Sequence, residues 1–155
     1  EAARRFGGRL ALVRGDVRRP PLMPGAVDAV VNLFTPADYG AFAAALKPGG
    51  WLIKAVPGPE HLAQLRERPA GRAETIDRIE AGFREHCKAV EAKRLCYDFS
   101  IDASDYEALS VMSPVSAHMR PQALERLRSR ACQAVTVDAL LLRGQMKDAC
   151  GEIFP

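Results

Sequence analysis

Short apolar runs that end at polar residues recur along the chain and predict strands of a sheet. The first run covers residues 10–13 and leads to Asp16, and the second covers residues 27–31 and stops at Asn32. A third run covers residues 51–56. Because short continuous apolar runs are typical of strands buried on both faces, we expect these three segments to be parallel strands of one sheet.

The segment between the second and third runs has the spacing of a helix. Apolar and aromatic side chains recur there at intervals of three and four residues, at Tyr39, Phe42, Ala43 and Leu46. The Lys-Pro-Gly-Gly sequence at residues 47–50 predicts a sharp end to this helix, because proline and glycine do not continue it. We therefore expect a helix that begins near Ala37.

Two more helices are expected after the third strand. Pro59 and Glu60 suit the first turn of a helix, where the missing proline N–H is harmless and the helix dipole favours a carboxylate. This helix should run through Leu62 and Leu65. Helical spacing then resumes at Ile76, Ile79, Phe83 and Cys87.

The last third of the chain adds two strands to the sheet. Alternation of side chains predicts an extended stretch over residues 95–99, and residues 134–142, rich in valine and leucine, predict the last strand. Residues 121–130 between them indicate a short helix. The order of elements predicts an α/β fold with a mostly parallel sheet and a late antiparallel strand, in one domain over residues 1–155.

Composition narrows the class of protein. The 22 basic and 19 acidic residues leave a mild positive charge, which permits RNA as a partner without demanding it. The four cysteines form no CxxC pair and no set with histidine at metal-ligand spacing, so we expect no metal site. No run approaches the roughly 18 apolar residues of a membrane span, and we expect a soluble, cytoplasmic protein that binds no membrane.

One long segment resembles the middle of a known enzyme class. The sequence VDAVVNLFTPADYGAFAAALKPGGWLIKAVPGPEHL at residues 27–62 contains a strand, an LKPGG turn and a further strand. This order is similar to the fourth strand, turn and fifth strand of class I S-adenosylmethionine-dependent methyltransferases. The resemblance implies a Rossmann-like sandwich and S-adenosylmethionine as the cofactor.

Two shorter segments resemble a narrower family. VPGPEHLAQLRE at residues 56–67 and ALSVMSP at residues 108–114 are similar to segments of the bacterial large-subunit ribosomal RNA guanine-N1 methyltransferases. The resemblance covers only the carboxyl-terminal part of such an enzyme, so the first two strands and the glycine-rich cofactor loop are expected to be lacking. It implies ribosomal RNA as the partner, and either a second copy or a missing amino-terminal segment to complete the sheet.

The resemblance also implies roles for residues at the strand ends. Asp16 would accept a hydrogen bond from the adenine amino group of the cofactor, although an ordinary turn aspartate is an equal alternative. Asn32 is implied as the catalytic residue, bordering the transferred methyl group, and Asn32, Leu33 and Phe34 would bind the cofactor. Asp38 and His61 are near in sequence, but the base that deprotonates a guanine N1 stays unassigned.

Two other functions stay open. Residues 115–118, Val-Ser-Ala-His, stand where the family usually has a Phe-Ala-Trp-Arg stretch, so stacking surface for a flipped base is lost. A small-molecule methyltransferase is therefore one alternative, because one fold hosts many functions. A non-catalytic module with the methyltransferase fold is the other.

Overall fold

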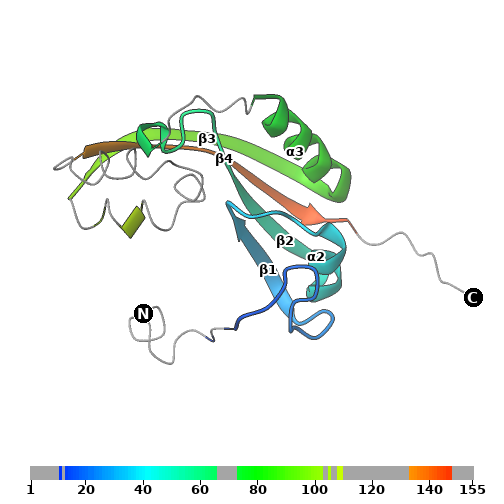
Figure 1. Cartoon of the computed structure of the whole chain (residues 1–155). Coiled ribbons are helices and arrows are strands. Elements are labelled where there is room, and N and C mark those ends of the chain that lie inside the picture. The colour runs from blue at the N-terminus through cyan, green and yellow to red at the C-terminus, as the bar shows by residue number, and fades with distance from the viewer. Residues whose placement is uncertain are drawn as a thin grey trace, which may run out of the picture.

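A four-stranded sheet forms the centre of the protein, with the strand order β1-β2-β4-β3 (Figure 1). The structure, a computed structural model, describes residues 11, 13–65, 73–102, 105, 108–109 and 133–147. The strands are β1 Val27–Leu33, β2 Leu46–Pro57, β3 Cys87–Ile101 and β4 Gln133–Met146. β1 and β2 are parallel, whereas β4 is antiparallel to β2 and β3. The predicted α/β fold with a late antiparallel strand is confirmed. The described sheet is mixed and not mostly parallel as predicted, because β4 pairs antiparallel with both of its neighbours.

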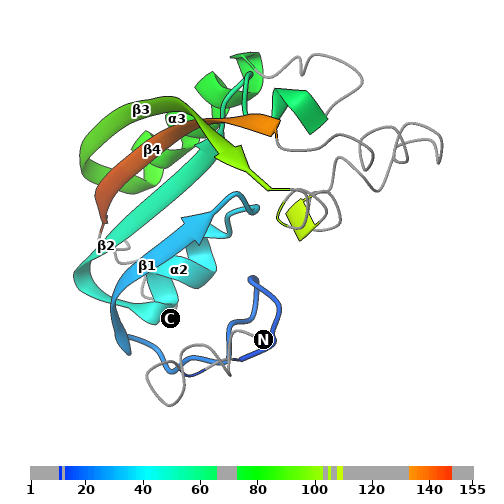
Figure 2. The same ribbon diagram turned by 90° about the vertical axis from the view of Figure 1, so that its left-hand side faces the viewer.

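Helices α2 (Tyr39–Ala45) and α3 (Ala73–His86) pack on one face of this sheet (Figure 2). Phe42 from α2 and Phe83 from α3 belong to the same buried cluster as the sheet residues Leu52 and Leu142. Both helices were predicted from the three-and-four spacing of their apolar residues, and both are confirmed. Within the described residues no helix is long and apolar enough to cross a membrane.

β1 is less buried than its apolar sequence predicts. Of its seven residues only Asn32 is buried, whereas the side chains of Val31 and Leu33 are 59% and 54% exposed. The prediction of a strand buried on both faces is wrong here, because β1 pairs only with β2 in the described sheet and α2 and α3 cover a single face.

The predicted strand at residues 10–13 is also wrong where the structure describes it. Ala11 and Val13 belong to no strand, and Val13 is 69% exposed. A strand needs a neighbour to bond its backbone groups, and none of the four described strands pairs with this segment. Leu10 and Leu12, like the predicted helix at residues 121–130, lie outside the described residues.

The helix predicted from Pro59 to Leu65 is replaced by a turn and the short 3-10 helix η2 (Ala63–Leu65). The backbone N–H of Leu62 donates to the Thr136 carbonyl of β4 at 2.8 Å, and the N–H of Glu60 donates to the Asp138 carboxylate at 3.0 Å. These donors bond to a distant strand, so the segment follows β4 instead of coiling.

Candidate functional site

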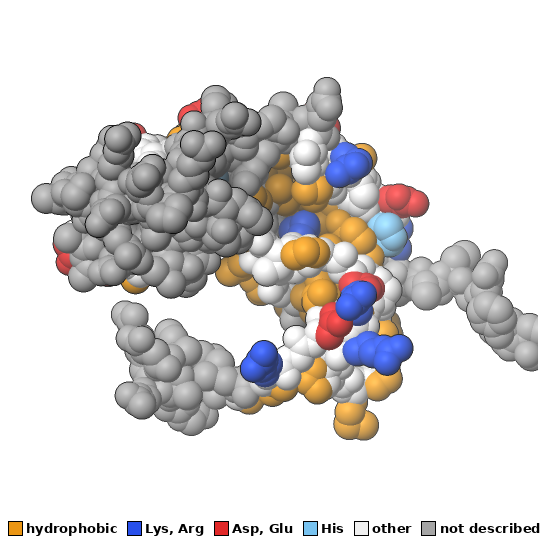
Figure 3. Space-filling model, in the orientation of Figure 1, with side chains coloured by type: hydrophobic (Ala, Val, Ile, Leu, Met, Phe, Trp, Pro, Cys, Tyr) orange, Lys and Arg blue, Asp and Glu red, His pale blue; other side chains and the backbone are white. Residues whose placement is uncertain are grey.

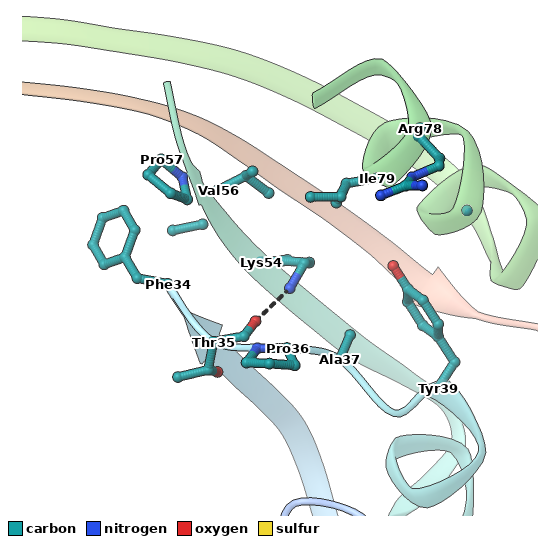
Figure 4. A pocket seen from close by; sticks show the side chains of 12 residues that line it. Phe34, Thr35, Pro36, Ala37, Tyr39, Lys54, Val56, Pro57, Arg78 and Ile79 are labelled. Atoms are coloured by element: carbon teal, nitrogen blue, oxygen red, sulfur yellow. Dashed lines mark hydrogen bonds between the residues drawn. The ribbon is translucent and has the colours of Figure 1, made fainter. Parts of the chain in front are cut away.

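A cavity of about 390 Å³ opens where the parallel strands β1 and β2 end (Figure 4). Its walls are the loop after β1, the end of β2 and one side of α3. In open α/β sheets, ligands bind in the crevice outside the carboxyl ends of the strands, so this cavity is the candidate site.

Lys54 is the buried basic residue of this site, with a side chain from β2 and a residue exposure of 4%. Its Nζ donates to Oδ1 of Asn32 at 2.5 Å and to the backbone carbonyl of Thr35 at 3.0 Å. Asn32 and Lys54 face each other because they are register partners on neighbouring strands. Burial lowers the pKa of the Lys54 amine, since the charged form loses water.

Both polar atoms of the Asn32 amide group form hydrogen bonds with other residues of the protein. Its Nδ2 donates to Oγ1 of Thr35 at 2.7 Å and to the carbonyl of Pro36 at 3.1 Å. Asn32 therefore ties the loop after β1 to Lys54, and both side chains are held in one orientation.

The opposite wall of the cavity is formed by the two helices. Tyr39 begins α2, and Arg78 and Ile79 come from α3 (Figure 4). Burial raises the pKa of the Tyr39 phenol, which keeps it neutral. On this side of the molecule, hydrophobic side chains surround an isolated basic side chain between α3 and α2 (Figure 3). The site combines an apolar lining with a few polar groups.

An aromatic pair stands at the mouth of the cavity. The rings of Phe34 and His61 stack with centroids 4.8 Å apart and an angle of 20°. Phe34 has φ 55°, a conformation that is rare for a residue with a side chain, and its N–H donates to the Ala55 carbonyl at 3.0 Å. Its side chain is nevertheless half-exposed, so a ring surface is presented to an incoming planar group.

The turn that carries His61 is anchored by Asp138 of β4. The side chain of Asp138 is 0% exposed, and its Oδ2 accepts from the N–H of Glu60 at 3.0 Å. Gly58 lies so close that a Cβ there would overlap the Asp138 carboxylate, and its N–H donates to the Asp138 carbonyl at 2.8 Å. Arg94 neutralises this buried charge with two hydrogen bonds of 2.9 Å.

The structure brings together some of the residues predicted from the sequence. Asn32 and Phe34 lie at the cavity, with Phe34 in its wall and Asn32 bonded to Lys54. Leu33 points to the other face of the sheet and is half-exposed. Asp16 lies in an exposed turn, where its carboxylate pairs with Arg18 at 2.9 Å, and this cation lowers the pKa of the Asp16 carboxyl.

Sequence reasoning missed Lys54, Arg78 and Asp138. Lys54 and Asp138 each interrupt an apolar strand sequence, WLIKAV and VTVDALLL, and a lone charge in such a run was the available signal. The signal does not identify a partner, because Asp138 and Glu60 are 78 residues apart. Among the described residues no group of three potential ligands could hold a metal ion.

Two known proteins that are similar to this chain carry the same kind of enzyme name. A Streptomyces fradiae 23S rRNA (guanine(748)-N(1))-methyltransferase is 31% identical over 110 residues, which are 68% of this chain and 39% of the relative. A Bacillus subtilis relative, assigned to the 23S rRNA guanine-N1 methyltransferases, is 28% identical over 137 residues, or 83% of this chain. The chain is homologous to the 23S rRNA guanine-N1 methyltransferases. The resemblance to this family that the sequence indicated is confirmed.

The homology covers part of these methyltransferases. The chain spans 47% of the length of the Bacillus relative, about half. No family model matches the chain. Among solved structures, a methyltransferase from Archaeoglobus fulgidus has a TM-score of 0.45 and 13% identity, covering 94% of this chain and 72% of that one. The YcgJ protein of Bacillus subtilis has a TM-score of 0.49 and 12% identity, covering 94% and 75%.

Proposed function

We propose that this chain forms part of an S-adenosylmethionine-dependent methyltransferase that methylates N1 of a guanine in 23S ribosomal RNA. The observation that carries the proposal is the homology to 23S rRNA guanine-N1 methyltransferases over most of the chain. The cavity at the ends of β1 and β2 supports it, because this is where an open α/β sheet places its ligands.

The residues at these strand ends fit the methyl end of S-adenosylmethionine. Phe34 offers a half-exposed ring beside the cavity, and the loop from Phe34 to Ala37 gives an apolar wall. When bound, S-adenosylmethionine supplies an electrophilic methyl group on a sulfonium. We propose that Phe34 borders the cofactor and that Asn32 positions the loop and Lys54. A role of Leu33 toward the cofactor stays a prediction, since its side chain lies on the other face of the sheet from the cavity. The role of Asp16 toward adenine stays a prediction, since Arg18 occupies its carboxylate.

Methyl transfer from a sulfonium is an in-line displacement, so the protein contributes position and a dry environment more than a covalent nucleophile. The largely apolar lining of the cavity suits such an environment. Phe34, which stacks on His61, keeps a half-exposed ring at the cavity, and this ring suits stacking with an aromatic acceptor such as a base. A second copy or an amino-terminal segment that completes the sheet stays a prediction.

Transfer of a labelled methyl group tests the proposal directly. The protein as its gene encodes it is incubated with methyl-labelled S-adenosylmethionine and a 23S rRNA transcript. We expect label in the RNA and a block to reverse transcription at one guanine, because a methyl group on N1 prevents Watson-Crick pairing. Label on small molecules of a cell extract and none on RNA would favour a small-molecule methyltransferase. Absence of label in both would indicate a non-catalytic module.

A further inference from the structure

Lys54 is an unusual residue for the middle of a strand. It is 4% exposed, with apolar neighbours on either side in β2, and its amine reaches the cavity (Figure 4). Within the described part of the chain no carboxylate pairs with it, and its two contacts are the neutral oxygens of Asn32 and Thr35. A buried lysine without a counter-ion is costly, so its place at a cavity needs a chemical reason.

Two oxygens of the protein accept from Nζ and leave its third bonding position toward the cavity. An ammonium has three N–H donors, and among the described residues only the Asn32 and Thr35 oxygens accept from Lys54. A neutral amine has two N–H groups and one lone pair. With both N–H groups bonded to the protein, the lone pair is left for the cavity side. In the neutral form of the amine, which burial favours by lowering the pKa of Lys54, this position is a lone pair that can accept a proton from a bound molecule.

The other ionisable groups of the cavity do not compete for this role. Tyr39, at the start of α2, is held neutral because burial raises the pKa of its phenol. Arg78, from α3, carries a guanidinium that has no lone pair to accept a proton. Burial lowers the pKa of Lys54 itself, so its amine changes charge closer to neutral pH than an exposed lysine does.

We propose that the Lys54 amine is the general base that removes the N1 proton of the acceptor guanine. This inference rests on the proposed function. Guanine N1 carries a proton and its lone pair is delocalised into the ring, so N1 attacks a methyl group only after the proton leaves. The Lys54 lone pair takes that proton, the N1–H electron pair forms the new N1–CH3 bond, and the S–CH3 pair stays on sulfur. The products are N1-methylguanine, S-adenosylhomocysteine and a Lys54 ammonium.

Arg78 and the aromatic pair complete a binding site for this base. Guanine presents O6 and N7 as acceptors, which arginine and lysine recognise. Arg78 lines the cavity opposite the loop after β1, and Phe34 at the mouth offers its half-exposed ring for stacking. Loss of the N1 proton places negative charge on O6, and a cation in the cavity wall stabilises that charge.

Two substitutions of Lys54 distinguish a role as a general base from a role as a positive charge. Lys54→Met removes the amine and keeps the length, whereas Lys54→Arg keeps a positive charge that cannot accept a proton. We expect each to lower kcat for labelled methyl transfer to 23S rRNA about a hundredfold or more, the range of general base catalysis. Lys93→Met, at an exposed position of β3, is the matched control and should leave kcat unchanged. Thermal melting of each variant shows whether it folds.

A titration that needs no cofactor gives the second measurement. NMR of the lysine side chains against pH should show the Lys54 amine losing its proton at a lower pH than an ordinary exposed lysine side chain. The kcat of the wild-type protein should rise with pH over the same range. A Lys54 amine that titrates with the exposed lysines would overturn the proposal, even if neither Lys54 variant folds.

The outcomes distinguish this proposal from the proposed function. If the wild-type protein methylates guanine and a folded Lys54→Met or Lys54→Arg variant keeps its kcat, the base is another group and only this proposal fails. If the wild-type protein transfers no methyl group to RNA, both fail together.

Discussion

Arg94 of β3 and Asp138 of β4 lie diagonally across the two strands and form two parallel hydrogen bonds, from Nε to Oδ1 and from Nη2 to Oδ2, each 2.9 Å long. The Asp138 side chain is 0% exposed, so its charge depends on this partner and on the N–H of Glu60. Because Glu60 and Gly58 belong to the turn before His61, the pair holds in place the turn whose His61 ring stacks on Phe34 of the cavity wall.

Replacing Asp138 should destabilise the protein strongly. Asp138→Asn removes the charge that accepts from Arg94, and we expect the free energy of unfolding at pH 7 to fall by about 2 to 3 kcal/mol, as for hydrogen bonds to charged groups. Urea titration measures this. Asp28→Asn, at an exposed residue paired with Lys47, is the control and should leave the stability unchanged.

The same variant gives a pH dependence with a defined sign. Arg94 holds the pKa of the folded Asp138 carboxyl below its usual value. The stability from this group is therefore present above the pKa of the unfolded state, about 3.9, and is lost as the pH falls through the lower folded pKa. The difference in stability between wild type and Asp138→Asn should shrink in strong acid; a difference that is constant from pH 7 to pH 2 would contradict this assignment.

Gly58 should not tolerate a side chain. A Cβ at Gly58 would overlap the Asp138 carboxylate, so Gly58→Ala should lower the free energy of unfolding by about 2 kcal/mol through overpacking. Gly82 in α3 has no atom within 4 Å of its Cβ position, and Gly82→Ala should instead stabilise the helix by about 1 kcal/mol. Equal effects of the two substitutions on thermal melting would show that the turn can move away from Asp138.

These contacts show what the sequence could and could not predict. The apolar runs predicted β1, β2 and β4 because strand periodicity is local. The turn after β2 was predicted as a helix because Pro59 and Glu60 suit a helix start. The N–H groups of Glu60 and Leu62 instead bond to Asp138 and Thr136 of a distant strand. The exposure of Val31 and Leu33 depends on which elements cover the sheet, and no local pattern encodes that.

Only part of the candidate site was predicted, because the rest depends on contacts between segments far apart in the sequence. Asn32 was found as a polar residue at a strand end, and its partner Lys54 was not, although one strand pairing sets them side by side. Register is a long-range property that depends on how β2 aligns with β1. Arg78 comes from a helix whose apolar face was predicted, but a helix pattern does not show which cavity its rim residues border.

Asn32→Asp should move the pH dependence of methyl transfer. A carboxylate at this position would pair with the Lys54 amine, stabilise its charged form and raise its pKa. We expect the rise of kcat with pH to shift to higher pH, with less activity at pH 7 and recovery in alkaline buffer. A merely structural role for Asn32 would lower kcat equally at every pH.

A substitution of Phe34 should weaken cofactor binding without a large effect on the stability of the fold. Asn tolerates the left-handed conformation that Phe34 adopts at φ 55°, so Phe34→Asn should change the free energy of unfolding by no more than about 1 kcal/mol. If Phe34 borders the cofactor, the Kd for S-adenosylmethionine should rise about tenfold in calorimetry of the protein as encoded by its gene. Tyr97→Asn, an exposed aromatic residue on β3, should leave that Kd unchanged.

Mass spectrometry of the nucleosides of 23S rRNA tests most directly the central claim that the protein methylates N1 of a guanine. Ribosomal RNA is isolated from cells of the source organism with the gene, without it, and with the Lys54→Met form, and is digested and analysed by mass spectrometry. We predict that N1-methylguanosine falls by one residue per 23S molecule when the gene is deleted, returns with the wild-type gene, and does not return with Lys54→Met. An N1-methylguanosine content that is the same with and without the gene would contradict the account.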